Sequence, residues 1–186
     1  PPAMEPNVQT LEQYLKTLYK TASDEWFFSV FASLCEALRK RHEEGLFFRT
    51  FSPQNVLLED KKTEPFFVRL EISTEAEPPG LITSPYLQSY LAPELREPDQ
   101  QPTPLSDIYS VGLILHAMIH RDDPPENPLP PLGHGKTELL LFEPLDQLIR
   151  KTSHRDPSKR LATIADVKKA LNDALRGFLQ RRRVEE

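Results

Sequence analysis

The hydrophobic pattern of the chain is mainly that of α-helices. Apolar residues recur three or four positions apart in four long stretches, which predict helices over residues 10–20, 25–44, 139–152 and 163–183. The stretch 25–44 has the broadest apolar face, so we expect a central helix that packs heavily against its neighbours. The pattern therefore predicts a mainly helical fold.

Polar residues at the ends of these stretches support the predicted boundaries. Thr10 and Gln13 have the spacing of a capping box, in which each side chain satisfies a backbone N–H of the other residue. Ser23 or Asp24 is a suitable N-cap for the second helix. Gly45 is a suitable C-cap for the same helix, because glycine adopts the left-handed conformation without a Cβ penalty.

Two short apolar runs predict a small β-hairpin. The run Val56–Leu58 is bounded by charged turn residues, and a second run covers residues 65–72. Prolines cluster around residues 78–104 and 124–131, so we expect stiff, irregular loops in these parts of the chain. The predicted fold class is mainly α, with one or two short β-hairpins.

Composition and charge narrow the class of protein. A chain of 186 residues has the size of one domain, and 38% apolar with 27% charged residues is ordinary for a soluble globular protein. The formal charge of -5 gives no reason to expect a nucleic-acid partner. No stretch approaches the apolar run of about 20 residues that a membrane span needs, so no membrane insertion is expected. The single cysteine, Cys35, fits a reducing, cytoplasmic location and lies in an apolar helical pattern that favours a packed thiol over a nucleophile.

One loop resembles the catalytic loop of protein kinases, which is written H-R-D-L-x-x-x-N. It reads Phe48-Arg49-Thr50-Phe51-Ser52-Pro53-Gln54-Asn55 and stands between a predicted helix and a predicted strand, as in that family. Thr50 occupies the aspartate position, and Ser52 stands where many relatives have lysine. Phe48 and Phe51 make the loop apolar, which favours packing over solvated chemistry. We refer to residues 48–55 as the kinase-like loop.

A second segment, Tyr90-Leu91-Ala92-Pro93-Glu94-Leu95, resembles the Y-x-A-P-E sequence that ends the activation region in the same family. In the family this glutamate pairs with a distant arginine. The resemblance therefore implies an ion pair between Glu94 and Arg160, which lies in the stretch 155–161. Arginine suits this role because its planar fork makes two parallel hydrogen bonds to one carboxylate.

The stretch 104–119 resembles the family's S-D-[IV]-[YW]-S-x-G helix, which is apolar nearly all round and runs through the centre of the larger lobe. The resemblance implies that Asp107 reaches the backbone of residues 48–49. Ser106 or Asp107 is also expected to cap the start of this helix. Gly112 would cost about 1 kcal/mol relative to alanine unless a neighbour packs closely on it, so close packing is expected there.

Two patterns suggest ligand binding but have simpler interpretations. His116 and His120 are four residues apart and could bind one metal ion, but without a third ligand a histidine pair that holds no metal is favoured. Residues 133–137 imitate part of a phosphate-binding loop, yet Pro130 stands in place of its first glycine and no strand precedes it. We therefore predict neither a cofactor nor a metal.

The order of these motifs implies the C-terminal, larger lobe of a protein kinase-like fold as a single domain over residues 1–186. The resemblance runs from about residue 4 to 176. Residues 1–9 look like the end of the linker between the two lobes, so the chain begins where a smaller lobe would stop. Residues 177–186 are interpreted as a basic tail.

The residues that phosphoryl transfer requires are largely missing from this lobe. Thr50 replaces the aspartate that orients the substrate hydroxyl in the family. The D-F-G triplet, whose aspartate holds magnesium, has no counterpart in residues 71–73 or 72–74. Glu71 could bind a hard cation together with Asn55, but a strand-edge glutamate is the favoured interpretation. Asn55 alone is retained, and an asparagine in a turn has a simple structural use.

These observations predict a catalytically inactive, pseudokinase-like module that acts as a protein–protein interaction or regulatory scaffold. Protein partners are expected on the surface that a small lobe would cover, or on the loops 74–89 and 122–137, with a peptide groove next to residues 84–92. The alternative is a divergent ATP-dependent protein phosphotransferase whose N-terminal lobe lies outside this chain. A third interpretation, a regulatory domain of a membrane receptor, would be supported by a hydrophobic segment beyond Glu186.

Overall fold

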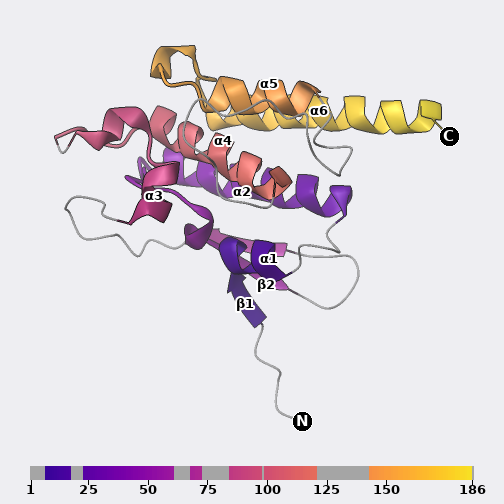
Figure 1. Cartoon of the computed structure of the whole chain (residues 1–186), viewed down its shortest axis with the longest axis horizontal. Coiled ribbons are helices and arrows are strands. Elements are labelled where there is room, and N and C mark those ends of the chain that lie inside the picture. Colours follow the sequence, from indigo (N-terminus) through magenta and orange to yellow (C-terminus); the bar gives the residue numbers. More distant parts are fainter. Residues whose placement is uncertain are drawn as a thin grey trace, which may run out of the picture.

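The computed structural model describes residues 7–17, 23–60, 68–72, 84–97, 99–120 and 143–185. In chain order the elements are β1 (Asn7–Thr10), α1 (Leu11–Thr17), α2 (Asp24–Glu43), the 3-10 turn η1 (Pro53–Asn55), β2 (Val56–Asp60), β3 (Val68–Ile72), α3 (Pro85–Tyr90), η2 (Pro93–Arg96), α4 (Pro104–His120), α5 (Glu143–Thr152), η4 (Pro157–Lys159) and α6 (Ile164–Glu185). Helices α5 and α6 lie along one side of the molecule, α2 and α4 lie in the middle, and the sheet and α1 lie on the opposite side (Figure 1). The predicted fold class, mainly α with a short hairpin, is confirmed.

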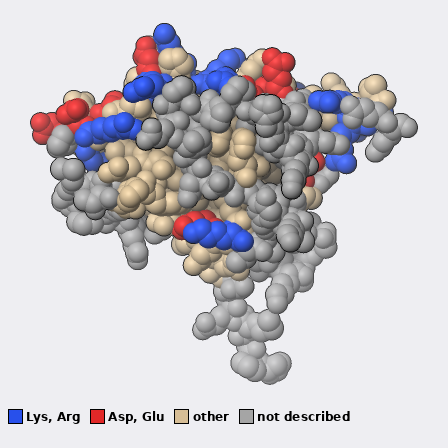
Figure 2. Space-filling model, in the orientation of Figure 1, with Lys and Arg blue, Asp and Glu red and all other residues tan. Residues whose placement is uncertain are grey.

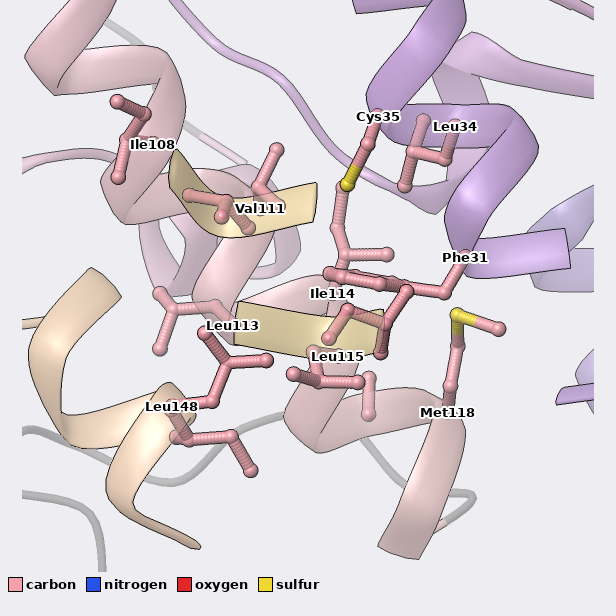
Figure 3. Packing of buried hydrophobic residues seen from close by; sticks show 14 of the residues in the cluster. Phe31, Leu34, Cys35, Ile108, Val111, Leu113, Ile114, Leu115, Met118 and Leu148 are labelled. Carbon is pink, nitrogen blue, oxygen red and sulfur yellow. The ribbon is translucent and has the colours of Figure 1, made fainter. Parts of the chain in front are cut away.

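The core forms around α2 and α4. Every residue of α4 from Ser106 to Ile119 is buried, as expected for a helix that is apolar nearly all round. Side chains of α2 pack against this helix, and Leu113 of α4 lies next to Leu148 of α5 (Figure 3). Each fully buried side chain of this size contributes about 1.5–3 kcal/mol by leaving water. The broad apolar face of residues 25–44 is thus explained by a central position between α4 and α6.

Cys35 belongs to this core. Its side chain is 1% exposed and lies between α2 and α4 (Figure 3). Burial raises the pKa of the Cys35 thiol to about 12, so the thiol stays protonated near neutral pH. A protonated, inaccessible thiol is a packing residue, which confirms the prediction for this cysteine.

The small sheet has three antiparallel strands in the order β1-β2-β3. The predicted hairpin between β2 and β3 is present, with Val56 opposite Ile72 and Leu58 opposite Leu70. Strand β2 continues two residues beyond the predicted Leu58, to Asp60. Residues 65–67, which the sequence also assigns to the second strand, lie outside the described residues.

Strand β1 is an element that the hydrophobic pattern did not predict. Residues 7–9 were expected to be linker and Thr10 to open a helix, but residues 7–10 pair with β2, with Gln9 opposite Leu58. The predicted capping box nevertheless forms, because the Thr10 N–H donates to Gln13 Oε1 and the Gln13 N–H donates to Thr10 Oγ1. Pairing with a strand 50 residues away leaves no local periodicity, so the sequence did not indicate it.

The expectation of a loop over residues 74–89 is wrong from Pro85 onwards. Residues 85–90 form the short helix α3, with Ser84 at the N-cap position and Pro85 as its first residue. Proline suits this place because its fixed φ is helical and its missing N–H would have no helical partner. Residues 74–83, all of 122–137 and the predicted helix start at 139–142 lie outside the described residues. Helix α5 is described from Glu143 onwards.

Candidate functional site

The kinase-like loop is reached through a sharp turn at the end of α2. Gly45 has a φ of 72°, the left-handed conformation that the sequence predicted for a glycine C-cap. The Gly45 N–H donates to the carbonyl oxygen of His42 at 3.0 Å, and the Leu46 N–H donates to that of Arg41 at 3.0 Å. These bonds satisfy two carbonyl groups at the helix end and direct the chain toward α4.

Asp107 of α4 holds the beginning of the loop. Its two carboxylate oxygens accept the Phe48 N–H at 3.1 and 3.3 Å, and Oδ2 also lies 2.8 Å from His42 Nε2. Burial raises the pKa of Asp107 to about 6, although the hydrogen bonds from His42 and Phe48 oppose this shift. Asp107 therefore joins α2, α4 and the kinase-like loop, and it reaches Phe48 as the resemblance implied.

His42 is a residue of this site that sequence reasoning missed. It lies four residues after Leu38 and seven after Cys35, so it stands on the buried face of α2. Its side chain is 10% exposed. A polar residue on the apolar face of a helix predicts a buried partner, and this was the available signal.

Arg49 fastens the loop to the segment that follows α3. Its guanidinium donates from Nη1 to the carbonyl oxygen of Gln100 at 2.9 Å. It donates from Nη2 to the carbonyl oxygens of Leu95 and Glu97, both at 3.3 Å. Arg49 thus binds backbone groups of the segment 95–100, a use that the motif itself did not indicate.

The centre of the loop is packed. Phe51 is fully buried, and its ring centroid lies 5.0 Å from that of Phe48. The Arg41 guanidinium lies 5.6 Å from the centroid of the Phe48 ring, within the range of a cation–π contact. Thr50, between these two rings in sequence, is half-buried. The apolar character noted in the sequence therefore corresponds to side-chain packing.

Ser52 and Asn55 close the loop on themselves. The Ser52 N–H donates to Asn55 Oδ1 at 3.0 Å, and the Gln54 N–H donates to Ser52 Oγ at 3.3 Å. This is a capping box for the 3-10 turn that leads into β2. The amide oxygen of Asn55 consequently has a structural use, as expected for an asparagine in a turn.

The positions that correspond to D-F-G are described only in part. Glu71 and Ile72 belong to β3, where their backbones stand opposite Leu57 and Val56. The side chain of Glu71 and residues 73–74 lie outside the described part of the structure, so the cation-binding alternative for Glu71 stays a prediction. Among the described residues there is no group of three or more side chains able to hold a metal ion.

Glu94 and Arg160 form a bidentate ion pair. Arg160 Nη1 lies 2.6 Å from Glu94 Oε1, and Nη2 lies 2.8 Å from Oε2. The other N–H groups of the guanidinium donate to three backbone carbonyl oxygens, those of Leu105, His154 and Arg155. All five donors of Arg160 are therefore used, and its side chain is 0% exposed. The pair joins η2, the start of α4 and the segment before η4.

Gly112 lies against the end of α5. A Cβ atom built on Gly112 would lie 2.8 Å from Thr152 Cβ and 3.1 Å from the Ser153 N, with Thr152 Oγ1 closer still. Thr152 Oγ1 itself donates to backbone carbonyl oxygens of α5 at 2.9 Å, so it is held in place. The close packing expected at Gly112 is present, and Thr152 is the neighbour.

Two other expectations for α4 concern the residue that caps its start and the histidine pair near its end. Neither Ser106 nor Asp107 is the N-cap, because Thr103 precedes the helix and its Oγ1 accepts the Ser106 N–H at 3.3 Å. Ser106 Oγ accepts the Thr103 N–H at 2.9 Å in return. The rings of His116 and His120 stack with centroids 4.1 Å apart. This stacking brings the two histidines together without a third candidate ligand in the described part of the chain.

Comparison with known proteins identifies the fold and the family. The family model described as protein kinase domain matches residues 4–174, which is most of the chain. A solved structure of the PknI kinase domain from Mycobacterium tuberculosis has a TM-score of 0.63 at 18% identity and covers 91% of this chain and 64% of its own. A double mutant of the same domain gives a TM-score of 0.69. At this identity the likeness is one of fold.

Curated relatives are similar over most of this chain but only part of their own length. Ribosomal protein S6 kinase 2 alpha of Xenopus laevis is 27% identical over 152 residues, which are 72% of this chain and 21% of that protein. Ribosomal protein S6 kinase alpha-2 of Homo sapiens is 26% identical over 182 residues, 86% of this chain and 24% of that protein. The chain thus spans about a fifth to a quarter of these relatives. On the family match, the chain belongs to the protein kinase family.

Proposed function

We propose that this kinase-like lobe is catalytically inactive and acts as a protein–protein interaction or regulatory scaffold in the cytoplasm. The observation that carries the proposal is Thr50, which stands at the place of the catalytic aspartate in a loop whose anchors are otherwise kept. The aspartate of active kinases accepts the proton of the substrate hydroxyl. A threonine side chain carries no charge for this task.

The contacts of Ser52 and Asn55 support the same proposal. Active relatives use groups at such positions on phosphates and metal ions. Here the Ser52 hydroxyl and the Asn55 amide oxygen bind backbone N–H groups of their own turn. A ligand that bound Asn55 Oδ1 would compete with the buried Ser52 N–H, which donates to this same oxygen. These polar groups therefore stabilise the conformation of the turn.

The anchors around the loop support a retained binding role. Asp107, Arg49 and Arg160 all bind backbone groups of neighbouring segments. These contacts preserve the lobe whatever the chemistry at position 50. A lobe that keeps its fold without the catalytic aspartate suits recognition of another protein, either on the surface that a small lobe would cover or on the segments 74–89 and 122–137.

A divergent ATP-dependent phosphotransferase is the second candidate. The relatives are named kinases, and Asn55 matches the asparagine of the family's catalytic loop. This candidate requires another group to take the role of the aspartate. It also requires a nucleotide site that includes residues outside this chain.

Nucleotide titration separates the two candidates. Thermal unfolding and calorimetry would be measured with ATP, with and without Mg²⁺ or Mn²⁺, on this chain and on the longest natural form. Ligand binding to the folded state alone stabilises it by RT ln(1 + [L]/Kd), about 2.7 kcal/mol at a hundredfold excess over Kd. We expect no shift of the unfolding midpoint in either form. A metal-dependent shift of several degrees would contradict the proposal.

The variant Thr50→Asp supplies the matched control. If only the aspartate were missing, this variant of the longest form would transfer phosphate from ATP to a generic peptide in the presence of Mg²⁺. We expect no transfer, because the metal-binding aspartate of D-F-G is absent as well. Transfer by Thr50→Asp would show that the rest of the site is functional.

A further inference from the structure

The last helix carries positive charge in a chain that is negative as a whole. Helix α6 contains six Lys or Arg residues and three Asp or Glu residues, whereas the formal net charge of the chain is -5. Four of the basic residues stand in its last ten positions, at 176, 181, 182 and 183. Lys and Arg side chains also gather at the end of the molecule where α6 finishes (Figure 2). The charge distribution is therefore strongly uneven.

The inner side of α6 packs against the core. Val167, Leu171, Ala174 and Phe178 are buried, and the Phe178 ring lies 5.9 Å from that of Phe28 on α2. Arg182 lies 3.8 Å from Asp24 and 6.0 Å from the centroid of the Phe178 ring. Helix α6 thus packs against α2 almost to the C-terminal end of α6, and its outer side faces away from this contact.

The outer side combines arginines with exposed apolar residues. Arg176 and Arg183 are seven residues apart and therefore share a face, with Leu179 between them. Leu179 is 41% exposed and Val184 is 86% exposed. We refer to Arg176, Leu179, Arg183 and Val184 as the outer α6 patch.

The charges of this patch are weakly compensated within the described part of the chain. Arg176 lies 4.0 Å from Asp173, and both side chains are mostly exposed, at 78% and 59%. An exposed pair of this kind contributes little to stability. Arg183 has no ion-pair partner among the described residues. Both guanidinium groups are consequently available to a carboxylate from outside.

We propose that the outer α6 patch docks an acidic peptide segment of a protein partner. Arginine binds carboxylates through two parallel hydrogen bonds, and nearby apolar side chains exclude water from such pairs. Arg176 and Arg183 are separated by seven residues of helix, or about 10 Å along the axis. Acidic residues three apart in a peptide of polyproline II conformation lie on the same side and are about 9 Å apart, because this conformation has three residues per turn and a rise of about 3.1 Å. The patch therefore fits the pattern Glu-x-x-Glu with an apolar residue between the two carboxylates.

A membrane surface fits the patch less well. A helix that lies in a lipid interface inserts a continuous apolar face. The apolar face of α6 is buried in the core, and the large apolar side chains that α6 exposes are Leu179 and Val184. A partner with its own carboxylates makes better use of two arginines than a surface that requires insertion.

Fluorescence anisotropy with the full chain tests this proposal. The probe is a fluorescein-labelled peptide of sequence E-L-S-E-L-S-E, and its scrambled counterpart E-E-E-L-L-S-S has the same charge. We expect the first peptide to bind more tightly and its affinity to fall with salt. The double variant Arg176→Glu/Arg183→Glu should weaken binding about tenfold or more, because two attractive pairs become repulsive.

The double variant Arg96→Glu/Arg155→Glu is the matched control. It changes the net charge by the same amount at two exposed arginines outside α6, so we expect affinity close to that of the unmodified chain. Thermal midpoints of both variants check that each one folds. The proposal is overturned by any of four results: no binding, equal weakening by both variants, equal binding of the scrambled peptide, or tighter binding to phosphatidylserine vesicles than to the peptide.

This inference goes beyond the proposed function and does not depend on it. Helix α6, which carries the outer α6 patch, lies on the side of the molecule away from the sheet (Figure 1). The kinase-like loop, in contrast, leads directly into β2 of that sheet. Failure of the peptide experiment leaves the nucleotide titration unaffected, and a metal-dependent ATP shift leaves the peptide experiment unaffected.

Discussion

The Glu94–Arg160 ion pair, called the joint below, and the kinase-like loop differ in how many residues of the family motifs they retain. At the joint, the residue types of the family motif are present and every N–H group of the Arg160 guanidinium has a partner. In the loop, the anchoring contacts are present, but Thr50 stands at the aspartate position of the family motif and Ser52 stands where many relatives have lysine. Both regions bind the same stretch of chain: Arg49 binds backbone groups of residues 95–100, and Arg160 binds Glu94 and the carbonyl oxygen of Leu105. Under the proposed function, this difference separates the residues that the fold requires from those that catalysis requires.

The way the loop is anchored explains why such a separation is physically possible. Asp107 binds the backbone N–H of Phe48, and Arg49 binds backbone carbonyl oxygens of the segment 95–100. The hydrogen bonds of these two anchors do not involve the side chain of Thr50. Position 50 can consequently change without loss of the loop, whereas a change at Arg160 would leave several polar groups without partners.

The largest effect is expected from Glu94→Gln. This change leaves the guanidinium of Arg160 fully buried without its countercharge, which costs about 3–5 kcal/mol of unfolding free energy. Urea denaturation of the purified variant measures the loss. The matched control is Asp146→Asn, which breaks an i,i+4 pair with the half-exposed Arg150 and should cost no more than about 0.5 kcal/mol. Equal losses at both sites would refute the special role of the joint.

The next effect concerns the pH dependence that Asp107 confers. Its folded-state pKa of about 6 lies above its ordinary value of 3.8, so the folded chain binds its proton more tightly than the unfolded chain does. The resulting stabilisation is complete below pH 4 and is lost as the pH rises through 6. Two pKa units correspond to about 3 kcal/mol.

Urea denaturation of the unmodified chain and of Asp107→Asn between pH 4 and 6 measures this effect. The stability of the unmodified chain relative to the variant should fall as the pH rises across this window. A difference that stays constant would show that Asp107 titrates in the folded chain as it does in the unfolded chain.

A smaller effect is expected where α4 meets α5. Gly112→Ala would normally stabilise a helix by about 1 kcal/mol, but the new methyl group overlaps Thr152, so overpacking should cost about 1–3 kcal/mol instead. Thermal and urea unfolding give the sign. In a Thr152→Ala background the loss should become smaller, because the closest atom, Oγ1, is gone. A stabilising Gly112→Ala would mean that the two helices separate easily.

The smallest effect is expected in the loop itself. Thr50→Asp alters a half-buried side chain on which neither anchor depends, so the unfolding free energy should change by about 0.5 kcal/mol or less. The same denaturation assay measures it. A loss of several kcal/mol would show that Thr50 is part of the anchoring, and the contrast between joint and loop would no longer hold.

Much of this architecture was predictable because it rests on local patterns. The helical spacing of apolar residues indicated four long helices, and the capping box at Thr10 and the left-handed Gly45 followed from neighbouring residues alone. Family motifs added the pairing of Glu94 with Arg160. Strand β1 and helix α3 were missed, because a four-residue strand and a helix of one and a half turns have too few residues for a period.

Local patterns and motifs were enough to identify the apolar residues of α2 and α4 that form the core, and the threonine that stands where the family has an aspartate. The partners of these side chains depend on the folded structure. It paired His42 with Asp107 across 65 positions, directed Arg49 to carbonyl groups of the segment 95–100, and set Thr152 against Gly112. Such partners come from distant elements that meet only when the core packs. No local period or propensity contains that information.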